Sequence, residues 1–97
     1  MRIIAKSKII EYYTAHPDAE VALEDWYQKV KGANWESFAD IKRMFNSVDS
    51  VGNQHYAFNI KGSNYRLVVV IKFTIKAVYI RFIGAHAEYD RIDVKNI

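Results

Sequence analysis

The sequence predicts an α+β fold, in which N-terminal helices pack on one face of a small antiparallel β-sheet. Three observations indicate this class. Apolar residues recur at helical spacing in the first half of the chain, and they alternate with polar residues in the second half. The connections between the alternating segments are short. The chain has 97 residues and no repeat or linker, so we expect a single domain over residues 1–97.

Three helices are expected in the first half of the chain. The first covers Lys6 to Ala15 and ends before Pro17, because the residue that precedes a proline disfavours the helical conformation. Asp18 is placed to cap the second helix, which ends at Gly32. Apolar residues at helical spacing mark its buried face, at Ala22, Leu23, Trp26 and Val30. The third helix has Asn34 or Ser37 as its cap and an apolar stripe of Phe38, Ile41 and Phe45.

Three strands are expected after a loop at residues 49–53. The alternating segments run from His55 to Lys61, from Tyr65 to Phe73 and from Val78 to Ile83. Turns at residues 62–64 and 74–76 connect them. Because both connections are short, the strands should pair as an antiparallel meander.

Strand alternation divides the side chains of this sheet between an apolar and a polar face. The apolar set should pack beneath the helices: Tyr56, Phe58, Ile60, Tyr65, Leu67, Val69, Ile71, Phe73, Val78, Ile80 and Phe82. The opposite set contains His55, Asn59, Lys61, Arg66, Lys72, Tyr79 and Arg81. Such a face could hold phosphates and stack unpaired bases. An ordinary solvated face of a one-sided sheet would also be polar.

The charge distribution is uneven along the chain. The net charge is +3, but residues 1–50 contribute −1, from seven Lys/Arg and eight Asp/Glu. Residues 51–97 contribute +4, from seven Lys/Arg and three Asp/Glu. A basic C-terminal half suits a polyanionic partner.

Several classes of function find no support in the sequence. There is no cysteine, which excludes disulfides, thiolate metal sites and a cysteine nucleophile. No Gly-rich phosphate loop or nucleophile elbow is present. No apolar run approaches the length of a membrane span, and no export signal is visible, so we expect a cytoplasmic protein.

A group of side chains with catalytic chemistry follows the last strand. If residues 85–90 are helical, His86, Tyr89 and Asp90 lie on one side at i, i+3 and i+4. They could supply a proton-transfer group, a phenol and an orienting carboxylate. A surface histidine beside a capping carboxylate is the simpler interpretation of the same residues. A metal site of His86, Glu88 and Asp90 is disfavoured, because no further ligands stand at a diagnostic spacing.

Four segments in order resemble the HigB toxin family. They are His55-Tyr56-Ala57-Phe58-Asn59-Ile60-Lys61-Gly62, then Tyr65-Arg66-Leu67-Val68, Val78-Tyr79-Ile80-Arg81 and His86-Ala87-Glu88-Tyr89-Asp90. The helical half is similar in layout, so the resemblance spans essentially the whole chain. It implies a RelE-like fold and a metal-independent, cofactor-free toxin that cleaves mRNA on the translating ribosome. It also implies a cognate HigA antitoxin with a helix-turn-helix domain.

The resemblance implies a transesterification in which the ribose 2′-OH attacks the adjacent phosphate. This reaction needs a base, an acid and positive charge around the phosphorane. The implied catalytic residues are Arg66, Arg81, His86, Tyr89 and Asp90. The implied RNA-binding residues are His55, Asn59, Lys61, Lys72 and Tyr79. Which side chains act as acid and base stays open, and His55 is a further candidate for proton transfer.

Two alternatives to a nuclease remain at the sequence level. A binding module would use the same basic face to hold RNA or a protein without a chemical step. A structural subunit would instead expose an apolar patch.

Overall fold

The helical half of the chain follows its apolar periodicity closely. The computed structural model describes residues 1–97, with helices α1 (Lys6–Ala15), α2 (Glu20–Lys31) and α3 (Phe38–Met44). The break at Pro17 and the end at Gly32 are confirmed, because a 3₁₀ turn, η1 (Pro17–Ala19), separates α1 from α2 and Gly32 is the C-cap of α2. None of the helices is both long enough and apolar enough to span a bilayer.

The sheet has five strands and is mostly antiparallel. Its strands are β1 (Arg2–Ile4), β2 (Asp49–Gly52), β3 (His55–Ile60), β4 (Tyr65–Lys72) and β5 (Ala77–Ala85). The spatial order is β1-β5-β4-β3-β2. The predicted β3-β4-β5 meander is confirmed, with a 3₁₀ turn, η2 (Phe73–Ile75), between β4 and β5.

The two outer strands were not expected from the sequence. β1 pairs in parallel with β5, so the sheet is mixed rather than purely antiparallel. Three residues are too few to show a periodicity. β2 pairs with β3 where a loop was predicted, because its Asp-Ser-Val-Gly sequence is typical of a turn. Pairing with β3 overrides that local preference.

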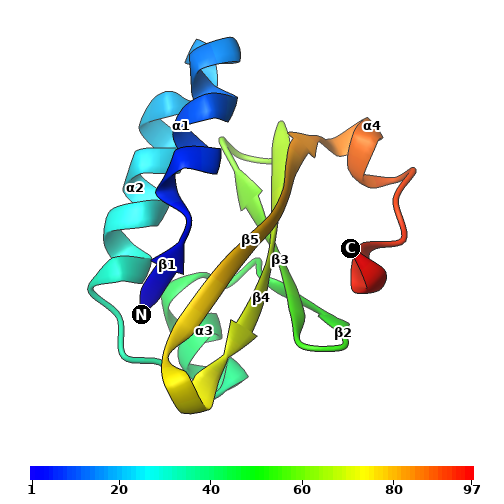
Figure 1. Cartoon of the computed structure of the whole chain (residues 1–97). Helices are drawn as coiled ribbons and strands as arrows, with labels where there is room; N and C mark the ends of the chain where they lie inside the picture. The colour runs from blue at the N-terminus through cyan, green and yellow to red at the C-terminus, as the bar shows by residue number, and fades with distance from the viewer.

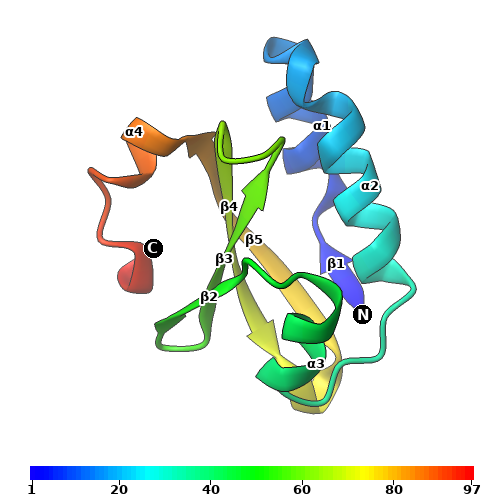
Figure 2. The same ribbon diagram turned by 180° about the vertical axis from the view of Figure 1, so that it is seen from behind.

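The helices cover one face of the sheet and leave the other to the C-terminal segment. In Figures 1 and 2, α1 and α2 lie on one side of the strands, whereas α4 (His86–Tyr89) and the C-terminus lie on the other. The core lies on the helical side, and Phe58 is at the centre of its aromatic rings. The Phe58 ring centroid is 5.5 Å from that of Trp26, 5.2 Å from that of Phe45 and 6.4 Å from that of Trp35. We call the opposite side the open face.

The prediction that Phe82 packs beneath the helices is wrong. β5 carries a bulge, because Val69 pairs with Ile80 but Val68 pairs with Phe82, which leaves Arg81 as the extra residue. Phe82 therefore shares the face of Val68, and Ile83 replaces it against the core. Period-2 alternation cannot reveal a bulge, because a single inserted residue reverses the faces of all that follow.

The expected role of Asp18 as a helix cap is also wrong. Its side chain makes no capping bond and instead reaches the β3–β4 turn. The Tyr65 hydroxyl donates to both carboxylate oxygens at 2.8 Å, and the Lys61 ammonium lies 3.2 Å from one of them. Asp18 thus connects the junction of α1 and α2 to the β3–β4 turn.

This contact predicts a pH-dependent contribution to stability. The hydrogen bonds from Tyr65 and Lys61 hold the pKa of the Asp18 carboxyl below its ordinary value of 3.8. A carboxyl with a lowered folded-state pKa stabilises the fold above its ordinary pKa and loses that effect as the pH falls through its folded-state pKa. Asp18→Asn should therefore lower the free energy of unfolding at about pH 6, and the difference should shrink as the pH falls below 3.8 through the folded-state pKa of Asp18.

Urea unfolding curves recorded across this pH range measure the effect. Asp25→Asn is the matched control, because it removes an exposed ion pair with Lys29 on α2. A constant difference between the wild-type chain and Asp18→Asn at every pH would contradict the assignment.

Candidate functional site

The strand register places the polar residues of the open face in two rows, with the apolar row of Ala57, Val68 and Phe82 between them. Asn59 on β3 pairs with Arg66 on β4, which pairs with Gly84 on β5. His55 pairs with Val70, which pairs with Tyr79. The predicted association of Asn59 and Arg66 with His55 and Tyr79 on one sheet face is therefore confirmed.

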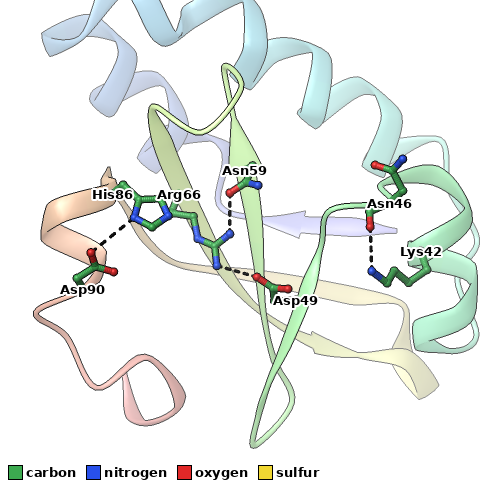
Figure 3. Close-up of polar contacts among 7 residues, drawn as sticks. All are labelled: Lys42, Asn46, Asp49, Asn59, Arg66, His86 and Asp90. Carbon is green, nitrogen blue, oxygen red and sulfur yellow. Dashed lines mark hydrogen bonds and ion pairs between the residues drawn. The ribbon is translucent and has the colours of Figure 1, made fainter.

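Arg66 is a buried cation held by residues from three other elements. Its side chain on β4 is only 6% exposed. One terminal nitrogen donates to Asn59 Oδ1 on β3 at 2.6 Å, and the other donates to Asp49 Oδ2 on β2 at 2.9 Å (Figure 3). Its guanidinium carbon lies 4.5 Å from the centre of the Tyr89 ring, within the range of a cation–π contact.

These contacts keep Arg66 charged despite its burial. Desolvation alone would lower the pKa of the guanidinium, but the neighbouring Asp49 carboxylate and Tyr89 phenol outweigh it and raise the pKa. Both terminal nitrogens are occupied, while the buried Nε atom has no partner. Arg66 is therefore held in one position against the face of the Tyr89 ring, and it keeps its positive charge there.

His55 and Arg81 converge on one point of the open face. His55 is 4% exposed, and its Nδ1 atom lies 2.7 Å from the main-chain oxygen of Asn53. Its Nε2 atom lies 2.9 Å from the main-chain oxygen of Ile97, and Arg81 Nε donates to that same oxygen at 3.2 Å. The β5 bulge places Arg81 there, so two groups that can bind a phosphate oxygen point at one position.

The expected trio after β5 forms on a short helix. His86 Nδ1 lies 3.6 Å from Asp90 Oδ2 (Figure 3). The His86 and Tyr89 ring centroids are 5.9 Å apart. His86 and Asp90 are exposed, whereas Tyr89 is half-buried over Arg66. Glu88 points elsewhere, because its Oε1 accepts the Ala85 main-chain N–H at 2.9 Å. The helix thus presents an imidazole and a phenol beside the open face.

Both predicted RNA-binding lysines contact other side chains of the protein. Lys61 contacts Asp18 near the helices, away from the row of Asn59 and Arg66. Lys72 donates to the Gln54 side chain at the opposite end of the sheet. Sequence alternation placed both on the open face, but it could not show that neighbouring polar groups bind them.

Three contributors to this face were not predicted from the sequence. Asp49 was assigned to a loop, yet it holds Arg66. Asn53 and Ile97 act through main-chain oxygens, which leave no signal in a sequence. The one available sign of Asp49 was that it is the last acid before residues 51–82, which hold five Lys/Arg and no Asp/Glu.

Known proteins that resemble the chain show which family it belongs to. Residues 19–92 match the family model described as HigB_toxin, RelE-like toxic component of a toxin-antitoxin system. The chain belongs to the HigB toxin family. Among its relatives, the mRNA interferase toxin HigB of Escherichia coli strain K12 is 34% identical over 82 residues, which cover 82% of this chain and 76% of that protein. The mRNA interferase HigB of Escherichia coli O6:H1 is 28% identical over 94 residues, which cover 95% and 91%.

The HigB match includes every group that builds the open face except the last residues. Asp49, His55, Arg66, Arg81 and the α4 residues all lie within 19–92, whereas Val94–Ile97 lies beyond that range. The HigB assignment and the RelE-like α+β fold expected from the sequence are therefore both confirmed.

The arrangement around Arg66 gives a stability prediction for this HigB chain. Asp49→Ala leaves a buried guanidinium without its carboxylate, and we expect the free energy of unfolding to fall by about 2 kcal/mol. Chemical denaturation with circular dichroism measures this loss. Asp25→Ala, which removes an exposed acid from an ion pair on α2, should change it by less than about 0.5 kcal/mol. Equal effects of the two changes would contradict the role of Asp49.

Proposed function

We propose that this chain is an mRNA interferase, a toxin that cleaves mRNA on the translating ribosome. Membership of the HigB family carries the proposal, because relatives that this chain covers over most of their length bear that name. The open face supplies supporting chemistry, since it carries cations, imidazoles and a phenol.

The proposed reaction is attack of a ribose 2′-OH on the adjacent phosphorus. A phosphorus–oxygen bond forms to the 2′-oxygen, the bond to the 5′-oxygen breaks, and the proton of the 2′-OH passes to a base. An acid returns a proton to the leaving 5′-oxygen. The products are a 2′,3′-cyclic phosphate and a free 5′-hydroxyl.

The residues divide between charge, proton transfer and stacking. Arg81 is exposed at the β5 bulge and supplies positive charge to the phosphate, and the buried Arg66 adds a second cation to the same face. His55 and His86 are the two imidazoles of this face, and Asp90 orients His86. Tyr89 lies over Arg66, where it can stack on a base or donate its phenol proton. Asn59 positions Arg66 rather than RNA.

A toxin of this kind needs a partner that restrains it. We propose a cognate HigA-type antitoxin with a helix-turn-helix domain. Residues 51–97 carry a net charge of +4, so an acidic segment of the partner would complement this half of the chain.

Arg81→Ala tests the function in living bacteria. Removal of a transition-state cation should reduce mRNA cleavage by about 100-fold and relieve growth arrest after induction. Primer extension on a translated reporter, beside one whose start codon is removed, detects the cleavage and its dependence on translation. Arg43→Ala is the matched control, because Arg43 is an exposed arginine on α3, paired with Asp40 and outside the residues of the open face.

The outcomes separate the candidate functions. Cleavage that persists in Arg81→Ala would remove Arg81 from the site. Cleavage of the untranslated reporter would contradict ribosome dependence. Intact growth and RNA with folded wild-type protein present would contradict the nuclease and leave a binding module.

A further inference from the structure

The last four residues lie across the candidate site rather than beside it. The segment Val94–Ile97, which includes the 3₁₀ turn η3 (Val94–Asn96), packs against β2 on the open face (Figure 1). Asn53 Nδ2 donates to the Lys95 main-chain oxygen at 3.0 Å. The second anchor is the Ile97 main-chain oxygen. It lies 2.9 Å from His55 Nε2 and accepts a hydrogen bond from Arg81 Nε at 3.2 Å.

The hydrogen bonds of His55 show what this segment does to the imidazole. Both ring nitrogens face main-chain oxygens, of Asn53 and of Ile97, and these oxygens can only accept. The Nε2 atom is therefore occupied and cannot take a proton from a 2′-OH while the segment is in place. Without the segment, Nδ1 keeps its contact with the Asn53 oxygen, and Nε2 is open to the substrate.

The Ile97 oxygen also stands where an anion would be expected. An N–H of a cationic side chain and an imidazole N–H meet at this one atom, an arrangement suited to a phosphate oxygen. A phosphodiester presents two anionic oxygens, so it can compete with the single Ile97 oxygen for Arg81 and His55.

We propose that Val94–Ile97 is a strap that occupies the phosphate subsite of this protein, and that RNA displaces it to reach His55 and Arg81. The proposal rests on the function proposed above, because it names a subsite of the same face. The strap lowers RNA affinity and blocks proton transfer until a polyanion competes for the two side chains. The anchoring bonds are few and the segment is short, so the strap can leave without unfolding the sheet.

The test compares the full chain with a chain that ends at Asp93, which keeps α4 but lacks the strap. The probe is an oligoribonucleotide with 2′-O-methyl groups, which cannot be cleaved. We expect the shortened chain to bind it about tenfold more tightly in fluorescence anisotropy, since RNA no longer competes with the Ile97 oxygen. In an Arg81→Ala background, the same shortening should give a much smaller gain, because part of the shared subsite is already absent.

A full-length variant separates the release of the strap from any other effect of shortening the chain. Asn53→Gly removes the side-chain anchor of Lys95 but keeps the main-chain oxygen that holds His55, and glycine tolerates the φ of 52° found at this position. We expect an intermediate gain in affinity. In ¹H–¹⁵N spectra of the wild-type chain, saturating RNA should move the Lys95 and Ile97 amide signals to unfolded-chain positions.

Unchanged or weaker binding by the folded, shortened chain would overturn the strap, as would Lys95 and Ile97 signals that stay in place at saturation. These readouts do not depend on cleavage. If RNA displaces the strap but no variant cleaves, the strap stands and the nuclease fails. If the wild-type chain cleaves as fast as the shortened chain with Ile97 in place, the nuclease stands and the strap fails.

Discussion

The buried guanidinium of Arg66 is the constraint around which the open face is built. Placing a charge in the middle of a sheet is costly unless it is paired and hydrogen-bonded. β2 supplies Asp49 and β3 supplies Asn59, while α4 covers the group with the Tyr89 ring. The short edge strand and the short final helix, which have little apolar surface of their own, are thereby held in position against β4. The same contacts set the location of Tyr89 relative to the rest of the face.

A second constraint is that the two faces of the sheet have different roles. The helical side contains the aromatic core around Phe58 and provides most of the burial. The open face is then free to carry groups that would be costly in a core. The bulge at Arg81 affects both faces. It turns Phe82 away from the core, and it directs Arg81 to the Ile97 oxygen. Its position therefore matters to both packing and chemistry.

Much of this architecture could be predicted from the sequence because it depends on local periodicity. The three helices, the β3-β4-β5 meander and the trio of His86, Tyr89 and Asp90 all follow from residue spacing. β1 and β2 could not be predicted, because each is short and stable only through its pairing with a neighbouring strand. Phe82 was misplaced because a bulge has no signature in an alternating pattern. The polar face was predicted in its residue types, but Lys61 and Asn59 show that a polar residue on this face can also bind another side chain of the protein.

The most direct test of the account is the chemistry of cleavage on a programmed ribosome. A reconstituted translation complex would carry either an all-ribose mRNA or the same mRNA with a single 2′-deoxy nucleotide at the cleavage position. The account predicts that the wild-type chain cleaves the first to a 2′,3′-cyclic phosphate and a 5′-hydroxyl, and leaves the second intact. Cleavage of the 2′-deoxy mRNA, or products with a 5′-phosphate, would show that the 2′-OH is not the nucleophile and would contradict the proposed use of this face.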